Sequence, residues 1–126
     1  VRPENIADRD SYFYYSLEAS SNPWTPDVTD LTPVLENMPE EFSVVYNDHL
    51  KAYLALYQER RAVLLRTAQY PWGPWSEPKT ALSCKKEDYC FGAKEVAAFS
   101  SEGGKKIFFT VEKKNMPYLY ELIFKP

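Results

Sequence analysis

Two glutamates stand at positions where acid–base chemistry would be expected. Glu41 opens a run that is otherwise apolar and β-branched, and Glu95 holds the comparable place in a later run. Burial among apolar neighbours raises the pKa of a carboxyl and suits it to donate a proton near neutral pH. We therefore predict a catalytic role for Glu41 and a substrate-binding role for Glu95. The acidic pair at residues 40–41 also fits a charged loop end.

Two tyrosines and one arginine are the other candidates for ligand contact. Tyr46 and Tyr53 lie close to the predicted inner strands. Arg66 sits inside the apolar run 64–67, where it could bind a carboxylate or a ring oxygen of a substrate. An anchor role fits Arg66 better, with its guanidinium paired to a carboxylate and hydrogen-bonded to turn carbonyls.

One histidine and two cysteines limit metal and nucleophile chemistry. His49 alone cannot form a multi-histidine zinc site, and Cys84 and Cys90 lack the paired spacing of a zinc ribbon. A Cys–His nucleophile pair is the alternative, but no glycine elbow or helix start frames either cysteine. The polar loop between the cysteines favours a disulfide, which indicates an oxidising compartment. No metal or cofactor is predicted.

Composition excludes several classes of function. The chain has 15 Lys plus Arg against 18 Asp plus Glu, so no basic excess points to nucleic acid or an anionic membrane. No apolar run is long enough for a transmembrane helix. Ten Tyr, seven Phe and three Trp are too many for a disordered chain. The start at Val1 is typical of a mature or processed end.

Short aromatic and β-branched runs predict an all-β, antiparallel fold. They are separated by turn-forming residues, and the prolines lie mostly outside them. The runs cover residues 12–17, 42–47, 52–58, 62–67, 96–99, 107–111 and 118–124. A helix over 48–59 is the alternative for one stretch, but the neighbouring residues favour strand, turn and strand.

A repeat of the form P-W-x-P predicts a β-propeller. Its copies, at 23–26 and 71–74, lie 48 residues apart, which is the period of a four-stranded blade. On this template, residues 12–34 supply the third and fourth strands of one blade, with the outer strand at 28–34. A full blade spans 41–84, and a partial last blade spans 94–126. The three tryptophans fit packing between blades better than sugar stacking.

The chain then holds about two and a half blades, and a closed ring needs at least four. We therefore expect the C-terminal part of a larger propeller, with a companion chain supplying the remaining blades and the missing outer strand. A second copy of the chain is the rival partner. A standalone β-sandwich would require the repeat to be accidental.

Several motifs together resemble one family. They are EFSVVYN at 41–47, YLALY at 53–57, LRTA at 65–68, GPWSEP at 73–78, GGK at 103–105, FFT at 108–110 and the closing run 118–124. The chain resembles the C-terminal half of a secreted domain-of-unknown-function family that includes endo-D-arabinanases. The resemblance implies a five-bladed propeller that is secreted, carbohydrate-directed and similar to glycoside hydrolases.

The resemblance leaves two functions open. A glycoside hydrolase needs two carboxyl groups flanking the scissile bond, the second of which we expect on the companion chain, so this chain alone should be inactive. The alternative is a non-catalytic propeller that serves as a lectin-like or structural module. A departure from the family pattern favours the alternative: many relatives place a His-Pro pair where this chain has Lys94-Glu95-Val96-Ala97. The expected ligand is a polysaccharide or glycan.

Overall fold

The computed structural model describes residues 1–17, 22–36, 41–88 and 90–125. The chain divides into two compact units, Val1–Glu36 and Asn37–Pro126, which are described separately. Throughout the described ranges, regular structure consists of antiparallel strands and single turns of 3₁₀ helix. The predicted all-β, antiparallel fold is confirmed, and its strand arrangement is that of partial propeller blades.

In its described residues, the first unit contains a two-stranded ribbon and three 3₁₀ turns. Its elements are Pro3–Asn5, Arg9–Ser11, β1 (Tyr14–Tyr15), β2 (Trp24–Thr25) and Val28–Asp30. The outer strand predicted at 28–34 is wrong, because Val28–Asp30 is a 3₁₀ turn. The Asp27 side chain caps this turn by accepting a hydrogen bond from the Thr29 amide at 2.9 Å. Such capping favours a turn over a strand.

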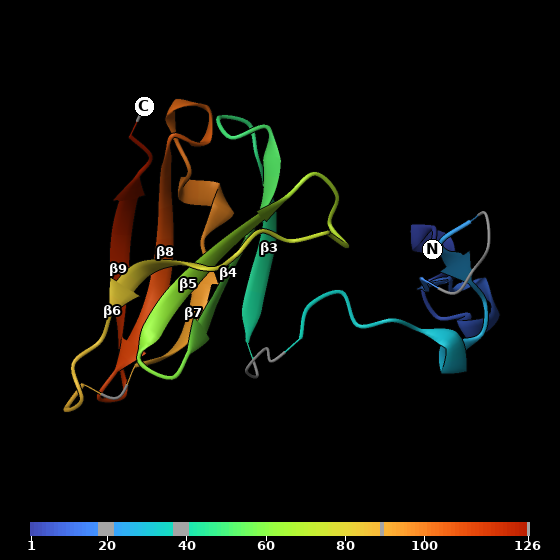
Figure 1. Cartoon of the computed structure of the whole chain (residues 1–126), viewed down its shortest axis with the longest axis horizontal. Helices are drawn as coiled ribbons and strands as arrows, with labels where there is room; N and C mark the ends of the chain where they lie inside the picture. The colour runs from blue at the N-terminus through green and yellow to red at the C-terminus, as the bar shows by residue number, and fades with distance from the viewer. Residues whose placement is uncertain (18–21, 37–40, 89, 126) are drawn as a thin grey trace. The chain divides into compact units, whose positions relative to one another are not determined.

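The second unit begins with a four-stranded sheet in which each strand pairs with the next along the chain. The strands are β3 (Phe42–Asn47), β4 (Ala52–Glu59), β5 (Ala62–Ala68) and β6 (Lys79–Ser83). They lie within the range 41–84 that the sequence predicts for one blade. β4 occupies the stretch for which a helix was the alternative, so the strand interpretation is confirmed there (Figure 1).

A three-stranded sheet completes the second unit. It contains β7 (Phe91–Glu95), β8 (Lys106–Lys113) and β9 (Met116–Ile123). The strand predicted at 96–99 is wrong, because Ala97–Phe99 is a 3₁₀ turn closed by the Phe99 amide on the Val96 carbonyl at 2.9 Å. β7 starts at Phe91, earlier than the predicted residue 94, and ends at Glu95.

The core of this unit lies between the two sheets. β7 packs against β3 and β4, and buried apolar side chains from both sheets meet there. The buried members are Leu56, Val63, Cys84, Cys90, Ala93, Phe109 and Val111. A polar contact joins the sheets at one end, where Asn47 Nδ2 donates to the Gly104 carbonyl at 2.8 Å.

The two copies of P-W-x-P have different local structures. Trp24 belongs to β2 and meets Tyr15 edge to face, with ring centroids 6.0 Å apart. Trp72 lies in the connection between β5 and β6 and stacks on Tyr70, with centroids 5.3 Å apart. Both tryptophans contact a neighbouring aromatic ring, so each takes part in packing within its own unit.

Candidate functional site

The first strands of the two sheets, β3 and β7, lie side by side and run in the same direction. The Glu95 amide donates to Ser43 Oγ at 2.8 Å, and two residues earlier on the β3 side Glu41 lies against Gly92. This order brings Glu41 and Glu95, both predicted as site residues, to the same strand pair. Glu41 lies two residues before Ser43, and Gly92 lies three residues before Glu95. The two glutamates are therefore offset by about 7–10 Å along the strand direction.

Glu95 is the carboxyl whose surroundings are most unusual. It stands opposite Phe109, which is buried in the core, so its side chain faces the space between the sheets. Its Oε2 is buried and has no hydrogen-bond partner in the described structure. This burial raises the pKa of Glu95 to about 7. A substantial fraction of this carboxyl therefore stays protonated at neutral pH, as a general acid requires.

Glu41 has the opposite environment. Its side chain is exposed, so the burial that the sequence predicts for it is wrong. The carboxylate lies at Gly92, where an added Cβ would come within 3.0 Å of Oε2. Gly92 has a φ of +65° and lies in a bulge of β7 opposite β8. The bulge brings the backbone of β7 close to Glu41 without an intervening side chain.

The predicted tyrosines lie on the other face of the β3–β6 sheet. Tyr46 and Tyr53 are directly paired across β3 and β4, with ring centroids 5.2 Å apart in an edge-to-face arrangement. Ser43, which contacts the backbone of Glu95, has the opposite parity along β3 and therefore faces the other way. The structure does not bring the tyrosines to the same face as the two glutamates.

Arg66 is also on the tyrosine face, because it is paired with Ala55, which lies two residues from Tyr53 on β4 and faces the same way. Its Nε donates to the Tyr57 hydroxyl at 2.8 Å, and its Nη1 donates to the Ser76 carbonyl at 3.3 Å. These bonds tie the segment after β5 to the sheet. The anchor interpretation predicts bonds to turn carbonyls and an ion pair with a carboxylate; the Ser76 contact is of the first kind, and among the described residues Arg66 forms no ion pair.

Sequence reasoning missed Ser43 and Gly92, which join the two strands of the site. A single Ser in an apolar strand and a Gly inside a strand were the available signals, since strand glycines often mark bulges or close backbone approach. Those signals give no partner, because the contact between β3 and β7 spans 52 residues of sequence.

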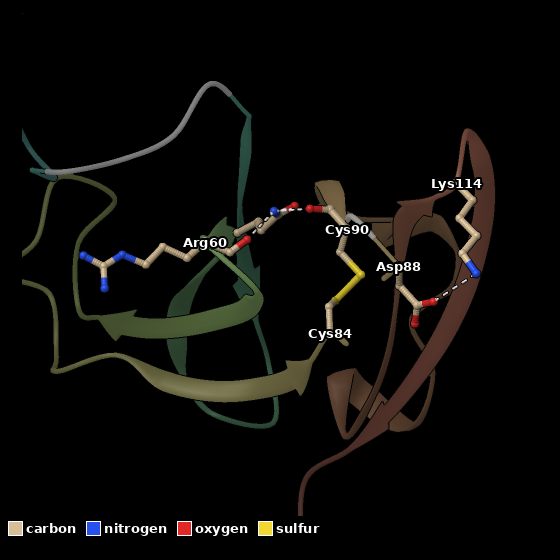
Figure 2. Close-up of a disulfide and its surroundings, with 6 residues drawn as sticks. Arg60, Cys84, Asp88, Cys90 and Lys114 are labelled. Carbon is tan, nitrogen blue, oxygen red and sulfur yellow. Dashed lines mark hydrogen bonds and ion pairs between the residues drawn. A yellow bond between two sulfur atoms is a disulfide. The ribbon is translucent and has the colours of Figure 1, made fainter. Parts of the chain in front are cut away.

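The predicted disulfide is confirmed. Cys84 and Cys90 are bonded to each other, and Figure 2 shows the bond between the end of β6 and the start of β7. Beside it, Lys114 forms an ion pair with Asp88 at 3.7 Å. Among the described residues, no group of three or more His, Cys, Asp or Glu side chains is arranged to hold a metal ion. No helix in the described ranges is long and apolar enough to cross a membrane.

The fold and this strand pair define an all-β, blade-forming protein with two carboxyl side chains at the junction of two sheets. The chain belongs to the family described as Domain of unknown function (DUF4185), which matches residues 1–126. A comparison with curated proteins finds no match. Family membership agrees with the resemblance to a domain-of-unknown-function family, and it carries no activity with it.

Proposed function

We propose that the chain is part of a secreted, carbohydrate-directed β-propeller that hydrolyses a furanoside polymer in the manner of an arabinanase. The observation that carries this proposal is the buried, unpartnered Oε2 of Glu95 at the strand pair that also holds Glu41. A buried carboxyl oxygen without a partner needs an explanation, and a proton donor for catalysis is one. The Cys84–Cys90 disulfide supports an extracellular location.

The proposed roles follow from the two environments. Glu95, with its raised pKa, donates its proton to the leaving glycosidic oxygen as the bond to the anomeric carbon breaks. Glu41, which is exposed, accepts a proton from the water that attacks that carbon. These roles require the two carboxyl groups to lie about 5–10 Å apart, as carboxyl pairs in glycosidases do.

The proposal includes a partner that extends the sheet arrangement. β9 forms one edge of the three-stranded sheet, and its Leu119 and Ile123 side chains are exposed. Exposed apolar edge strands favour pairing with another strand. We propose that a companion chain, or a second copy of this chain, supplies the blades that close the ring.

A non-catalytic, lectin-like role is the second candidate. It is favoured by the exposure of Glu41, because bulk water solvates that carboxylate and weakens its electrostatic interaction with a reacting group. In that case Glu95 would be a structural or ligand-contacting group, and glycan would bind without being cleaved.

The test begins with the native and denatured masses of the protein from its source. A companion or a second copy supports the proposed ring, whereas a folded 14.7 kDa monomer contradicts it. The recovered assembly is then assayed for release of reducing sugar from linear arabinan. Glu95→Gln is expected to lower this activity at least about 100-fold, the contribution expected of a general acid.

The control is Glu77→Gln, which removes an exposed carboxyl from the connection between β5 and β6 and should leave the activity unchanged. Binding of arabinan without cleavage by the wild-type assembly would favour the lectin-like role. Cleavage that Glu95→Gln leaves intact would overturn the assignment of Glu95 as the acid.

A further inference from the structure

A cavity lies at the end of the second unit, beside the disulfide. It has a volume of about 540 Å³, which lies within the range of small-ligand sites. Its described lining is Gln58, Arg60, Arg61, Lys86, Cys90 and Phe91. Three of the six described lining residues are cationic, and none of the six is acidic. The net charge of the whole chain is −3.

The cavity is built by segments that hydrogen bonds hold together. Gln58 donates through Nε2 to the carbonyl of Arg60 at 3.0 Å and also to the carbonyl of Cys90. The Cys84 amide donates to the Arg61 carbonyl at 2.7 Å. The β4–β5 turn and the loop before β7 are therefore fixed to each other, with the disulfide between them (Figure 2).

The three cations are available for a ligand. In the described part of the chain, none of Arg60, Arg61 and Lys86 forms an ion pair, and all three are exposed. The Arg60 side chain points away from the disulfide while its carbonyl faces Gln58 (Figure 2). Arg60 also has a φ of +54°, which arginine rarely adopts.

Nearby acids do not cancel this charge at the cavity wall. Asp88 is engaged with Lys114, while Glu59 and Glu87 are sequence neighbours of the cations but do not line the cavity. A positive φ is ordinary at the first position of a two-residue hairpin turn, so it is the unpaired like charges at the cavity wall that favour an anionic ligand.

The remaining lining residues narrow the chemical class of the ligand. Phe91 is 40% exposed and offers an aromatic surface, on which the apolar face of a sugar ring can pack. Arginines bind carboxylate or phosphate through two parallel hydrogen bonds.

We propose that this cavity binds an acidic sugar unit, whose carboxylate or phosphate meets Arg60, Arg61 and Lys86 while its ring lies on Phe91. The choice of a sugar rests on the proposed carbohydrate-directed function. The cavity therefore selects for a negatively charged ligand. The site of the two glutamates does not, since carboxylates repel an anion.

Calorimetric titration of the full chain with trigalacturonic acid tests the uronate form, and glucose 6-phosphate tests the phosphate form. Arabinotriose serves as the neutral probe. In the variant Arg60→Gln/Arg61→Gln/Lys86→Gln, binding of the acidic probe is expected to weaken at least about tenfold, since it loses charge-assisted hydrogen bonds. The control is Lys79→Gln/Lys94→Gln/Lys125→Gln, which removes the same charge from exposed positions outside the cavity.

Lys86→Gln alone replaces one exposed loop side chain, and it should weaken binding in the same direction if the triple variant fails to fold. Binding of only one acidic probe identifies the anionic group. The proposal is overturned if neither acidic probe binds, or if the control weakens binding as much as the cavity variant does. If arabinotriose binds while both acidic probes fail, the proposed function stands and only this inference fails. Binding of the acidic probes without arabinotriose supports this inference and leaves the proposed function to the arabinan assay of the assembly.

Discussion

Two polar side chains at the junction of the sheets, Asn47 and Glu95, have opposite hydrogen-bonding environments. Asn47 is buried, and its amide group is used at both ends: Nδ2 donates to the Gly104 carbonyl, and Oδ1 accepts from the Leu50 amide at 2.9 Å. Glu95 has a buried oxygen with no partner in the described structure and a pKa raised to about 7.

This difference separates a structural polar group from a functional one. A buried group with its bonds satisfied helps to fix the fold, whereas an unsatisfied ionisable group lowers stability and is available for chemistry. Asn47 belongs to β3 and Gly104 to the loop before β8, so their bond connects the two sheets. Glu95 is part of the same junction but contributes an acid that the fold does not neutralise.

The largest effect on stability is expected when the hydrogen bonds of the Asn47 side chain are removed. Asn47→Ala leaves the Gly104 carbonyl and the Leu50 amide without their partner, and we expect it to lower the free energy of unfolding by about 2–3 kcal/mol. Urea unfolding followed by circular dichroism measures this loss. Asn5→Ala, at an exposed position in the first unit, is the control and should leave the second unit unchanged. A loss no larger than that of the control would contradict the connecting role of Asn47.

The next effect has the opposite sign. Because burial raises the pKa of Glu95, its ionisation opposes folding: the penalty is absent below the ordinary pKa of about 4.5, grows as the pH rises towards 7 and is complete above that. Glu95→Gln removes the charge and should stabilise the chain by about 1–3 kcal/mol at pH 8.

At pH 4 the same substitution should have little effect, since the carboxyl is then protonated in both states. Urea unfolding at the two pH values measures the difference, with Glu121→Gln as the exposed control. A stabilisation that is equal at both pH values would show that the ionisation of Glu95 is not its source. Any hydrolytic activity should fall as the pH rises through 7, because the proposed acid loses its proton there.

The strand runs of the second unit could be predicted because their signal is local. The runs 42–47, 52–58 and 62–67 alternate or cluster apolar residues between clear turns, and β3, β4 and β5 occupy them. The strands predicted at 28–34 and 96–99 are wrong. Capping by the Asp27 side chain favours a 3₁₀ turn in the first, and a local hydrogen bond from the Phe99 amide to the Val96 carbonyl favours one in the second. The residue types in a run do not show whether such local hydrogen bonds will replace strand pairing.

The candidate site was less accessible to sequence reasoning. Glu41 and Glu95 could be chosen because they are acids beside apolar runs, but which of the two is buried depends on the packing of β7 against β3 and β4. Tyr46 and Tyr53 were near in sequence, yet strand parity puts them on the other face. The cavity beside the disulfide was missed because Arg60 and Arg61 come from the β4–β5 turn and Lys86 comes from the loop before β7, 25 residues later.

A smaller effect tests the close approach of Glu41 to β7. Gly92→Ala introduces a Cβ 3.0 Å from Glu41 Oε2 at a φ of +65°, so we expect a loss of about 1 kcal/mol, mostly from the backbone conformation. The exposed carboxylate can move away from the new methyl group. In the active assembly this displacement should lower kcat more than it raises KM. Gly103→Ala is the control, since its φ is also positive but no atom lies within 4 Å of the added Cβ.

The smallest effect on stability is expected for an ion pair at the surface. Lys106 Nζ lies 2.7 Å from Glu102 Oε1, and this ion pair lowers the pKa of Glu102. Its contribution to stability is therefore present at neutral pH and fades as the pH falls below the ordinary carboxyl range. Water and salt screen such a pair, so Glu102→Gln should shift the urea midpoint least of these substitutions and not at all in 1 M salt. A loss as large as that of Asn47→Ala would mean that burial does not decide which polar groups hold the two sheets together.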